Sequence, residues 1–151
     1  MNKYTFHKYS KNYKSLFNKE KEKLSKILKD CKIYHVGSTA IPNLGGKEII
    51  DILITTNKID INKKILEKNN YSYIQDAGSK ERLYFEKNKI NLHLTKSSSK
   101  EAKNMLNFVK VLRKNKKLKE KYENIKKQAV KYAKGNSKKY KKFKSKFFNN
   151  I

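Results

Sequence analysis

Residues that could bind a phosphate and a metal ion are concentrated in one short segment, residues 35–53, which reads HVGSTAIPNLGGKEIIDIL. Gly37 would let a phosphate approach the main chain, and the Ser38 hydroxyl could donate a hydrogen bond to it. Asp51 offers the hard oxygen ligand that Mg²⁺ or Mn²⁺ prefers. The ordinary alternative is a tight turn in which Ser38 caps the following helix, and the Gly-Ser pair alone favours that alternative.

Asp51 is more informative because it interrupts the apolar run at residues 49–54. An unpaired carboxylate is unfavourable in an apolar interior. We therefore expect Asp51 to lie at a strand end in a cleft, to be neutralised by a cation such as Lys47, or to bind a metal ion.

Two histidines and one arginine could act together with Asp51. His93 lies in an alternating segment where Asn91 shares its face, and His35 stands two residues before Gly37, where its side chain could face the same cleft. Asp51 and His93, with His35 as a third ligand, would suit a divalent ion softer than Mg²⁺. Alternatively, His93 is a general base or a phosphate-binding donor, and a structural role for either histidine is at least as good an explanation. Arg82 could make a bidentate contact to a phosphate or carboxylate.

The elements that must position these residues come mainly from the first 96 residues. Apolar residues at three- and four-residue intervals predict an amphipathic helix over 11–30 and another over 59–69. Short β-branched runs predict strands at 33–36, 49–54 and 71–75, and a hairpin of strands 82–86 and 90–95. The glycine-rich segment 37–46 must then be the turn between the first two strands.

From residue 97 onward the pattern is helical. Ser98 and Glu101 have the spacing of a capping box that opens a helix. A second helix is expected over about 118–134, with Gly135 as its stop, and Asn136 or Ser137 could cap a last helix. We expect one domain over 1–151, with a helix and sheet in 1–96 and helices in 97–151, in the α/β (α+β) class.

The chain is strongly basic, with 39 Lys and Arg against 13 Asp and Glu in 151 residues and a formal charge of +26. Only Arg82 and Arg113 are arginine. Such an excess of lysine over arginine is typical of an AT-rich genome, in which lysine codons accumulate. The charge therefore predicts a general attraction for polyanions without selecting one. A lone Cys31 excludes an internal disulfide, and the absence of a long apolar run or signal peptide favours a soluble cytoplasmic protein away from membranes.

The lysine-rich region 110–146 is a second candidate surface. It holds sixteen Lys and Arg113 against Glu120 and Glu123, with aromatic residues at helical spacing. It could bind RNA or another polyanion. A solvated helical face with a buried aromatic side explains the same pattern better, because no base-stacking module is recognisable.

The motifs together resemble the GrpB family, a branch of the nucleotidyltransferase superfamily. Residues 35–54 are similar to its His-hydrophobic-Gly-Ser-Thr signature with the following Pro-containing loop and hydrophobic-Asp-Ile strand. The resemblance extends to residues 9–24, 82–85 and 91–94 and to the closing helices. Matches in those helices are Tyr122, Lys126, Tyr140, Lys144 and Phe147. Departures are Asn43 in place of glycine, Glu48 in place of proline, and Val109-Lys110 where Arg-Asp is common.

The resemblance implies a mixed β-sheet with packed helices and a cleft that binds a nucleoside triphosphate. Residues expected to contact it are His35, Gly37, Ser38, Thr39, Lys47 and Arg82, with Asp51 and His93 as catalytic and metal-binding residues. The superfamily's second and third metal carboxylates are replaced here by Leu53 and by the pair Asn91 and His93. A nucleotidyltransferase with a reduced metal site is therefore one hypothesis. A non-catalytic nucleotide- or RNA-binding protein on the same fold is the other.

Overall fold

A five-stranded mixed β-sheet is the centre of the computed structural model, which describes residues 9–45 and 48–133. The strands lie in the order β1-β2-β5-β4-β3. Their bounds are β1 Cys31–Val36, β2 Ile50–Thr56, β3 Ser72–Tyr73, β4 Arg82–Lys87 and β5 Ile90–Thr95. β2 and β5 are parallel, and the other neighbouring pairs are antiparallel. The expected mixed sheet and the hairpin of β4 and β5 are confirmed.

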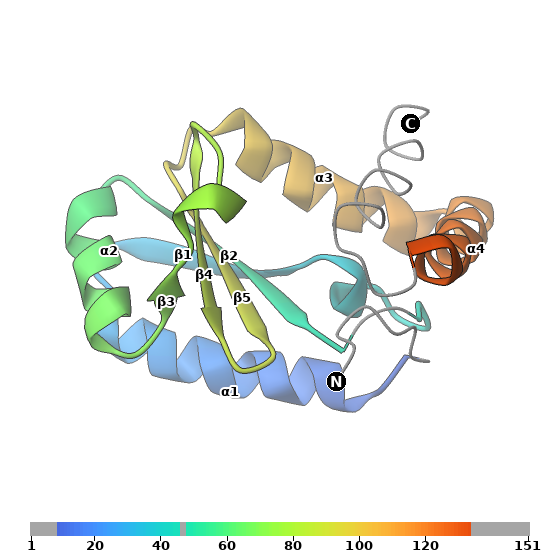
Figure 1. Ribbon diagram of the computed structural model, residues 1–151, viewed down its shortest axis with the longest axis horizontal. Coiled ribbons are helices and arrows are strands. Elements are labelled where there is room, and N and C mark those ends of the chain that lie inside the picture. Colours follow the sequence, from blue (N-terminus) through green and yellow to red (C-terminus); the bar gives the residue numbers. More distant parts are fainter. Residues whose placement is uncertain (1–8, 46–47, 134–151) are drawn as a thin grey trace.

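Helices cover both faces of this sheet (Figure 1). Their bounds are α1 Asn12–Ile27, α2 Ile59–Lys68, α3 Lys100–Lys114 and α4 Lys116–Ala133, with short 3₁₀ helices η1 at Ser38–Ala40 and η2 at Gln75–Ala77. Figure 1 shows α1 along one side of the sheet and α3 along the other. Within the described residues, none of these helices combines the length and apolarity needed to cross a bilayer.

Two apolar clusters, one on each face, explain why β2 lacks alternation. Ile50, Ile52 and Ile54 belong to the cluster under α1 and α2. Leu53 belongs to the cluster with α3 and α4, together with Val36 at the end of β1. Because side chains alternate along a strand, Asp51 points to the same face as Leu53. That face therefore carries Asp51 of β2 and, in the neighbouring strand β5, Asn91 and His93.

Two boundaries differ from the sequence-based expectation. The N-cap of α3 is Ser99, whose hydroxyl accepts a hydrogen bond from the Ala102 N–H at 3.3 Å, so the capping box of Ser98 and Glu101 is wrong by one residue. The third strand is only two residues long, because the chain turns into η2 where the strand was expected to continue. The expected stop at Gly135 and the last helix lie outside the described residues.

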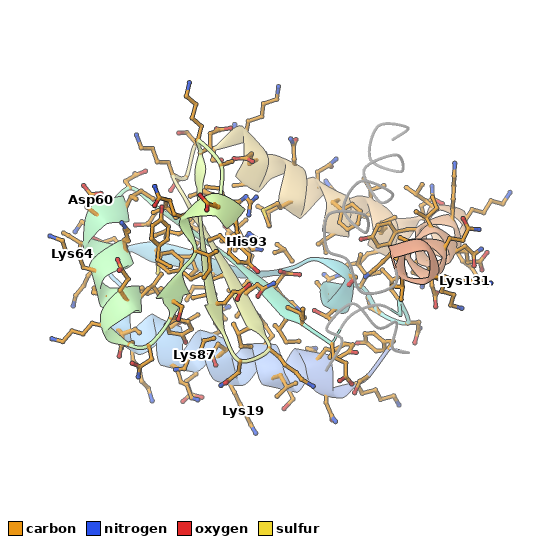
Figure 2. The ribbon with its side chains drawn as sticks, in the orientation of Figure 1. Lys19, Asp60, Lys64, Lys87, His93 and Lys131 are labelled. Atoms are coloured by element: carbon orange, nitrogen blue, oxygen red, sulfur yellow. The ribbon has the colours of Figure 1, made fainter. Side chains whose placement is uncertain are left out.

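Lysines cover the outside of the molecule. Figure 2 shows Lys19, Lys64 and Lys131 pointing outward from α1, α2 and α4, whereas His93 lies in the middle of the fold. Helices with charged outer surfaces therefore cover both faces of the sheet. The polar side chains inside the fold are separate from these exposed lysines.

Candidate functional site

Asp51 lies directly beside the turn that follows β1. Its register partner is Val36, so Gly37 comes next to the Asp51 side chain. Gly37 has φ +73°, and a Cβ built on it would lie 2.7 Å from Asp51 Oδ2. Only glycine fits here, because any larger residue would meet the carboxylate and would also be strained at this φ. The sequence thus places a carboxylate against the backbone of a glycine turn.

His93 connects Asp51 to Arg82. His93 Nε2 is 3.1 Å from Asp51 Oδ1, and Arg82 Nη1 is 2.7 Å from His93 Nδ1. A guanidinium can only donate, so Nδ1 accepts and the ring proton sits on Nε2, which donates to Asp51. In this arrangement neither ring nitrogen offers a lone pair to a metal ion.

Arg82 is oriented in turn by α3. Arg82 Nε lies 3.9 Å from Glu101 Oε1, and Glu101 also accepts a hydrogen bond from the Ser79 hydroxyl. The contacts run from Glu101 through Arg82 and His93 to Asp51. They link the first turn of α3 to the start of β2 across the face of the sheet.

Side chains of α3 and α4 hold the turn that follows β1. Arg113 donates from Nε and Nη2 to the Ala40 carbonyl at 3.1 and 2.8 Å, and Lys119 Nζ donates to the Pro42 carbonyl at 3.2 Å. Sequence reasoning missed Arg113 as a site residue. Its rarity was the available signal, because the argument that singled out Arg82 among many lysines applies equally to Arg113.

His35 lies on the opposite side of the sheet from His93. Its ring stacks on Phe17 of α1, with centroids 4.6 Å apart and an interplanar angle of 10°. The expectation that it faces the same cleft is not met, because neighbouring Ile33 and Val36 fix the alternation of β1. His35 Nε2 instead lies 2.9 Å from Thr39 Oγ1, and this contact supports the turn from the side of the sheet that α1 covers.

The environment of His35 keeps it neutral. Burial lowers its pKa to about 4; the positive charge of Arg113 acts in the same direction, and the negative charge of Asp51 opposes both. Thr39, the partner of His35, is also buried. Both residues therefore shape the turn from inside.

Lys126 brings an amino group into the interior of the α3 and α4 side. It is only 1% exposed, and its Nζ atom lies 5.4 Å from the ring centroid of Tyr122. Tyr122 is also buried, and its pKa is raised by burial and then by the negative charge of Asp51. Tyr122 thus lies within electrostatic reach of Asp51. Nothing in the sequence separates Lys126 from the other lysines except its place in the family resemblance.

The remaining acids do not join Asp51. Glu48 pairs with Lys89 at 3.1 Å, and Asp76 is exposed in η2. Among residues 9–45 and 48–133, no group of three or more His, Cys, Asp or Glu side chains could hold a metal ion. These residues therefore do not fit a two-metal centre. Lys47 lies outside the described part of the chain.

Comparisons with known proteins agree with this fold. A solved structure of conserved protein GrpB from Enterococcus faecalis superposes with a TM-score of 0.83 and 27% identity, covering 97% of this chain and 98% of that one. UPF0157 protein BH1888 from Halalkalibacterium halodurans is 31% identical over 136 residues, which are 85% of this chain and 70% of the relative. UPF0157 protein YqkA from Bacillus subtilis is 34% identical over 84 residues, 52% of this chain, and the match spans only 24% of that protein.

A more distant structural neighbour indicates the wider fold. Cid1, solved in complex with the UTP analogue UMPNPP, superposes with a TM-score of 0.51 and 16% identity over 84% of this chain and 40% of that chain. This likeness concerns the fold alone, which is nucleotidyltransferase-like. A family model described as GrpB protein matches residues 3–151. Because the family model matches nearly the whole chain and a GrpB structure superposes over almost its full length, the chain belongs to the GrpB family.

Proposed function

We propose that this protein binds a nucleoside triphosphate at the Asp51 site, which we define as Gly37, Asp51, Arg82 and His93. The observation that carries the proposal is the packing of the Asp51 carboxylate against the Gly37 backbone, on the sheet face where His93 and Arg82 also lie. A glycine turn lets phosphate oxygens approach main-chain N–H groups, and a carboxylate beside it can share a cation with them. The UTP analogue in Cid1 lends support, because that protein has a similar fold.

A divalent cation, Mg²⁺ or Mn²⁺, fits this proposal with Asp51 as its one protein carboxylate. Mg²⁺ is often held by one or two carboxylates while substrate phosphates and water complete its coordination. When bound, such an ion would offset part of the triphosphate charge. His93 acts as a positioning residue in this scheme, because its Nε2–H holds one oxygen of Asp51 and Arg82 holds the ring.

The other residues support the turn or supply positive charge. Ser38 opens η1 and is the turn hydroxyl nearest the phosphates in this proposal. Thr39 and His35 hold the turn from inside, and Arg113 holds it from α3. Lys126 adds a buried amino group on the same side of the sheet. From the sequence, we also propose that Lys47 is a phosphate ligand.

The reaction that suits this binding mode is nucleotidyl transfer. An acceptor hydroxyl would lose its proton to water and attack the α-phosphorus, the bond from the α-phosphorus to the oxygen that bridges to the β-phosphorus would break, and pyrophosphate would leave. A second candidate is binding without catalysis. The presence of one carboxylate, with no further acid beside it among the described residues, favours that second candidate.

Calorimetric titration with ATP, GTP, CTP and UTP, each with Mg²⁺ or Mn²⁺, tests the binding. We expect at least one triphosphate to bind, and Asp51→Asn to weaken it by about tenfold, since a charged contact of about 1.4 kcal/mol is lost. Asp76→Asn is the matched control, because it makes the same change at an exposed acid and should leave the affinity unchanged. Failure of every triphosphate to bind the native protein would overturn the proposal.

Pyrophosphate release separates the two candidates. A transferase should release pyrophosphate with an acceptor present, and Asp51→Asn should abolish that release while Asp76→Asn keeps it. Binding without any release, under the same conditions, would favour the non-catalytic candidate. Release that survives Asp51→Asn would remove Asp51 from the chemistry.

A further inference from the structure

A basic hollow lies where α3 ends and α4 begins. Its volume is about 500 Å³, and Val111 forms part of its lining. The polar lining residues are Asn107, Lys110, Lys114, Asn115, Lys116 and Lys117. We call this hollow the elbow groove. Four of its seven lining residues are lysine and none is acidic, so the groove is a local concentration of positive charge.

The placement of Lys116 and Lys117 is electrostatically unfavourable for the free protein. Both lie in the first turn of α4, where the helix dipole is positive, and that turn has no acidic residue. Asn115 already uses its side-chain oxygen and its carbonyl to accept from the Leu118 and Lys119 N–H groups at 3.0 Å each. Two lysines at a helix start thus break a local rule without an evident gain in stability, which is expected at functional sites. A bound anion would relieve the repulsion.

We propose that the elbow groove binds the phosphodiester backbone of single-stranded nucleic acid. Several separate lysines around an open hollow suit a chain of phosphates better than one compact anion. Asn107 can form hydrogen bonds to a base or ribose, and Val111 gives an apolar surface beside them. A membrane surface fits less well. The large exposed apolar residues of the described chain, Leu16 and Ile61, lie on α1 and α2 and not beside the groove.

The groove is connected to the Asp51 site by the same two helices. Arg113, next to Lys114, binds the Ala40 carbonyl, and Lys119, two residues after Lys117, binds the Pro42 carbonyl. A strand bound in the groove would therefore lie beside the helices that hold the glycine turn. That this strand is the acceptor of the transferred nucleotide rests on the proposed function, whereas its binding to the groove does not.

Fluorescence anisotropy with a labelled single-stranded RNA of about 12 nucleotides, titrated at several KCl concentrations between about 50 and 200 mM, tests the groove. The test variant replaces Lys110, Lys114, Lys116 and Lys117 with glutamine. We expect its affinity to fall at least about tenfold, and the slope of log K against log salt to become shallower by up to about 3. The matched control replaces four exposed lysines of α1 with glutamine. These are Lys14, Lys19, Lys21 and Lys23.

The control should keep its RNA affinity within about threefold, because it removes the same charge from another part of the molecule. Equal losses in the two variants would overturn the proposal, and so would failure of the native protein to bind the RNA. If the variant with four groove lysines replaced lost binding to phosphatidylserine vesicles but kept its RNA affinity, the proposal would also be overturned, and a membrane surface would be the ligand of the groove. Triphosphate calorimetry on the same proteins keeps the two proposals apart: RNA binding through the groove without triphosphate binding would support the groove and overturn the proposed function.

Discussion

At the scale of single residues, His35 predicts a pH dependence of stability. Its folded pKa is about 4, below its usual value of 6.5, so between these values the unfolded chain binds a proton that the folded protein does not. Stability therefore falls as the pH drops from about 6.5 to about 4, by about 1–2 kcal/mol for this group once solvent screening of the partly exposed ring is allowed for.

Urea unfolding of the native protein and of His35→Gln, at several pH values across this window, measures the effect. Glutamine keeps a hydrogen-bonding group near Thr39 but does not titrate. We expect the native protein to lose more stability than the variant as the pH falls. Parallel pH profiles for the two proteins would contradict the assignment.

The residues of the site differ in how far the sequence could predict them. Strand alternation is a local feature, so it placed Asn91 and His93 on one face correctly, and the hypothesis that His93 acts together with Asp51 agrees with their 3.1 Å contact. The hypothesis that His35 faces the same cleft is wrong. Alternation places His35 on the face of Ile33, and only the packing of that face against Phe17 of α1, which is distant in the sequence, shows which side of the sheet this is. The burial of Lys126 was invisible, since it depends on how α4 packs and not on residue type.

At the scale of elements, the start of α3 gives a sharp comparison between neighbouring serines. Ser99 is buried and caps the helix, whereas Ser98 is exposed. Ser99→Ala should lower the free energy of unfolding by about 1 kcal/mol, because it leaves a helix N–H without its acceptor. Ser98→Ala should change it little. Chemical denaturation of both variants checks this, and equal effects would favour the capping box expected from the sequence.

Elements with strong periodicity were predicted well, and elements fixed by distant contacts were not. α2 and the hairpin of β4 and β5 follow from apolar spacing and turn residues within each segment. β3 is short because it pairs only with two residues of β4, and no local pattern marks where that pairing ends. The cap of α3 was misassigned because three consecutive serines offer equivalent hydroxyls to a sequence-based argument.

At the scale of the whole molecule, a formal charge of +26 should make stability depend on salt. Excess like charge repels itself in the compact state, and salt screens this repulsion. Raising NaCl from about 50 to 500 mM should therefore raise the melting temperature by a few degrees, as followed by circular dichroism; at these concentrations the Debye length shortens from above 10 Å to well below it. A melting temperature that falls or stays constant would contradict this. Choline chloride at the same ionic strength controls for effects specific to sodium.

The sheet topology also has a consequence for the order of folding. Asp51 and His93 are 42 residues apart, and they meet only because β5 inserts beside β2 in parallel, between β2 and β4. Long-range parallel pairing forms slowly, since the intervening chain must close into a large loop first. β1 and β2 can pair earlier through the shorter Gly37 turn. The Asp51–His93 contact is therefore expected among the last to form, so that the Asp51 site is complete only in molecules whose folding is complete.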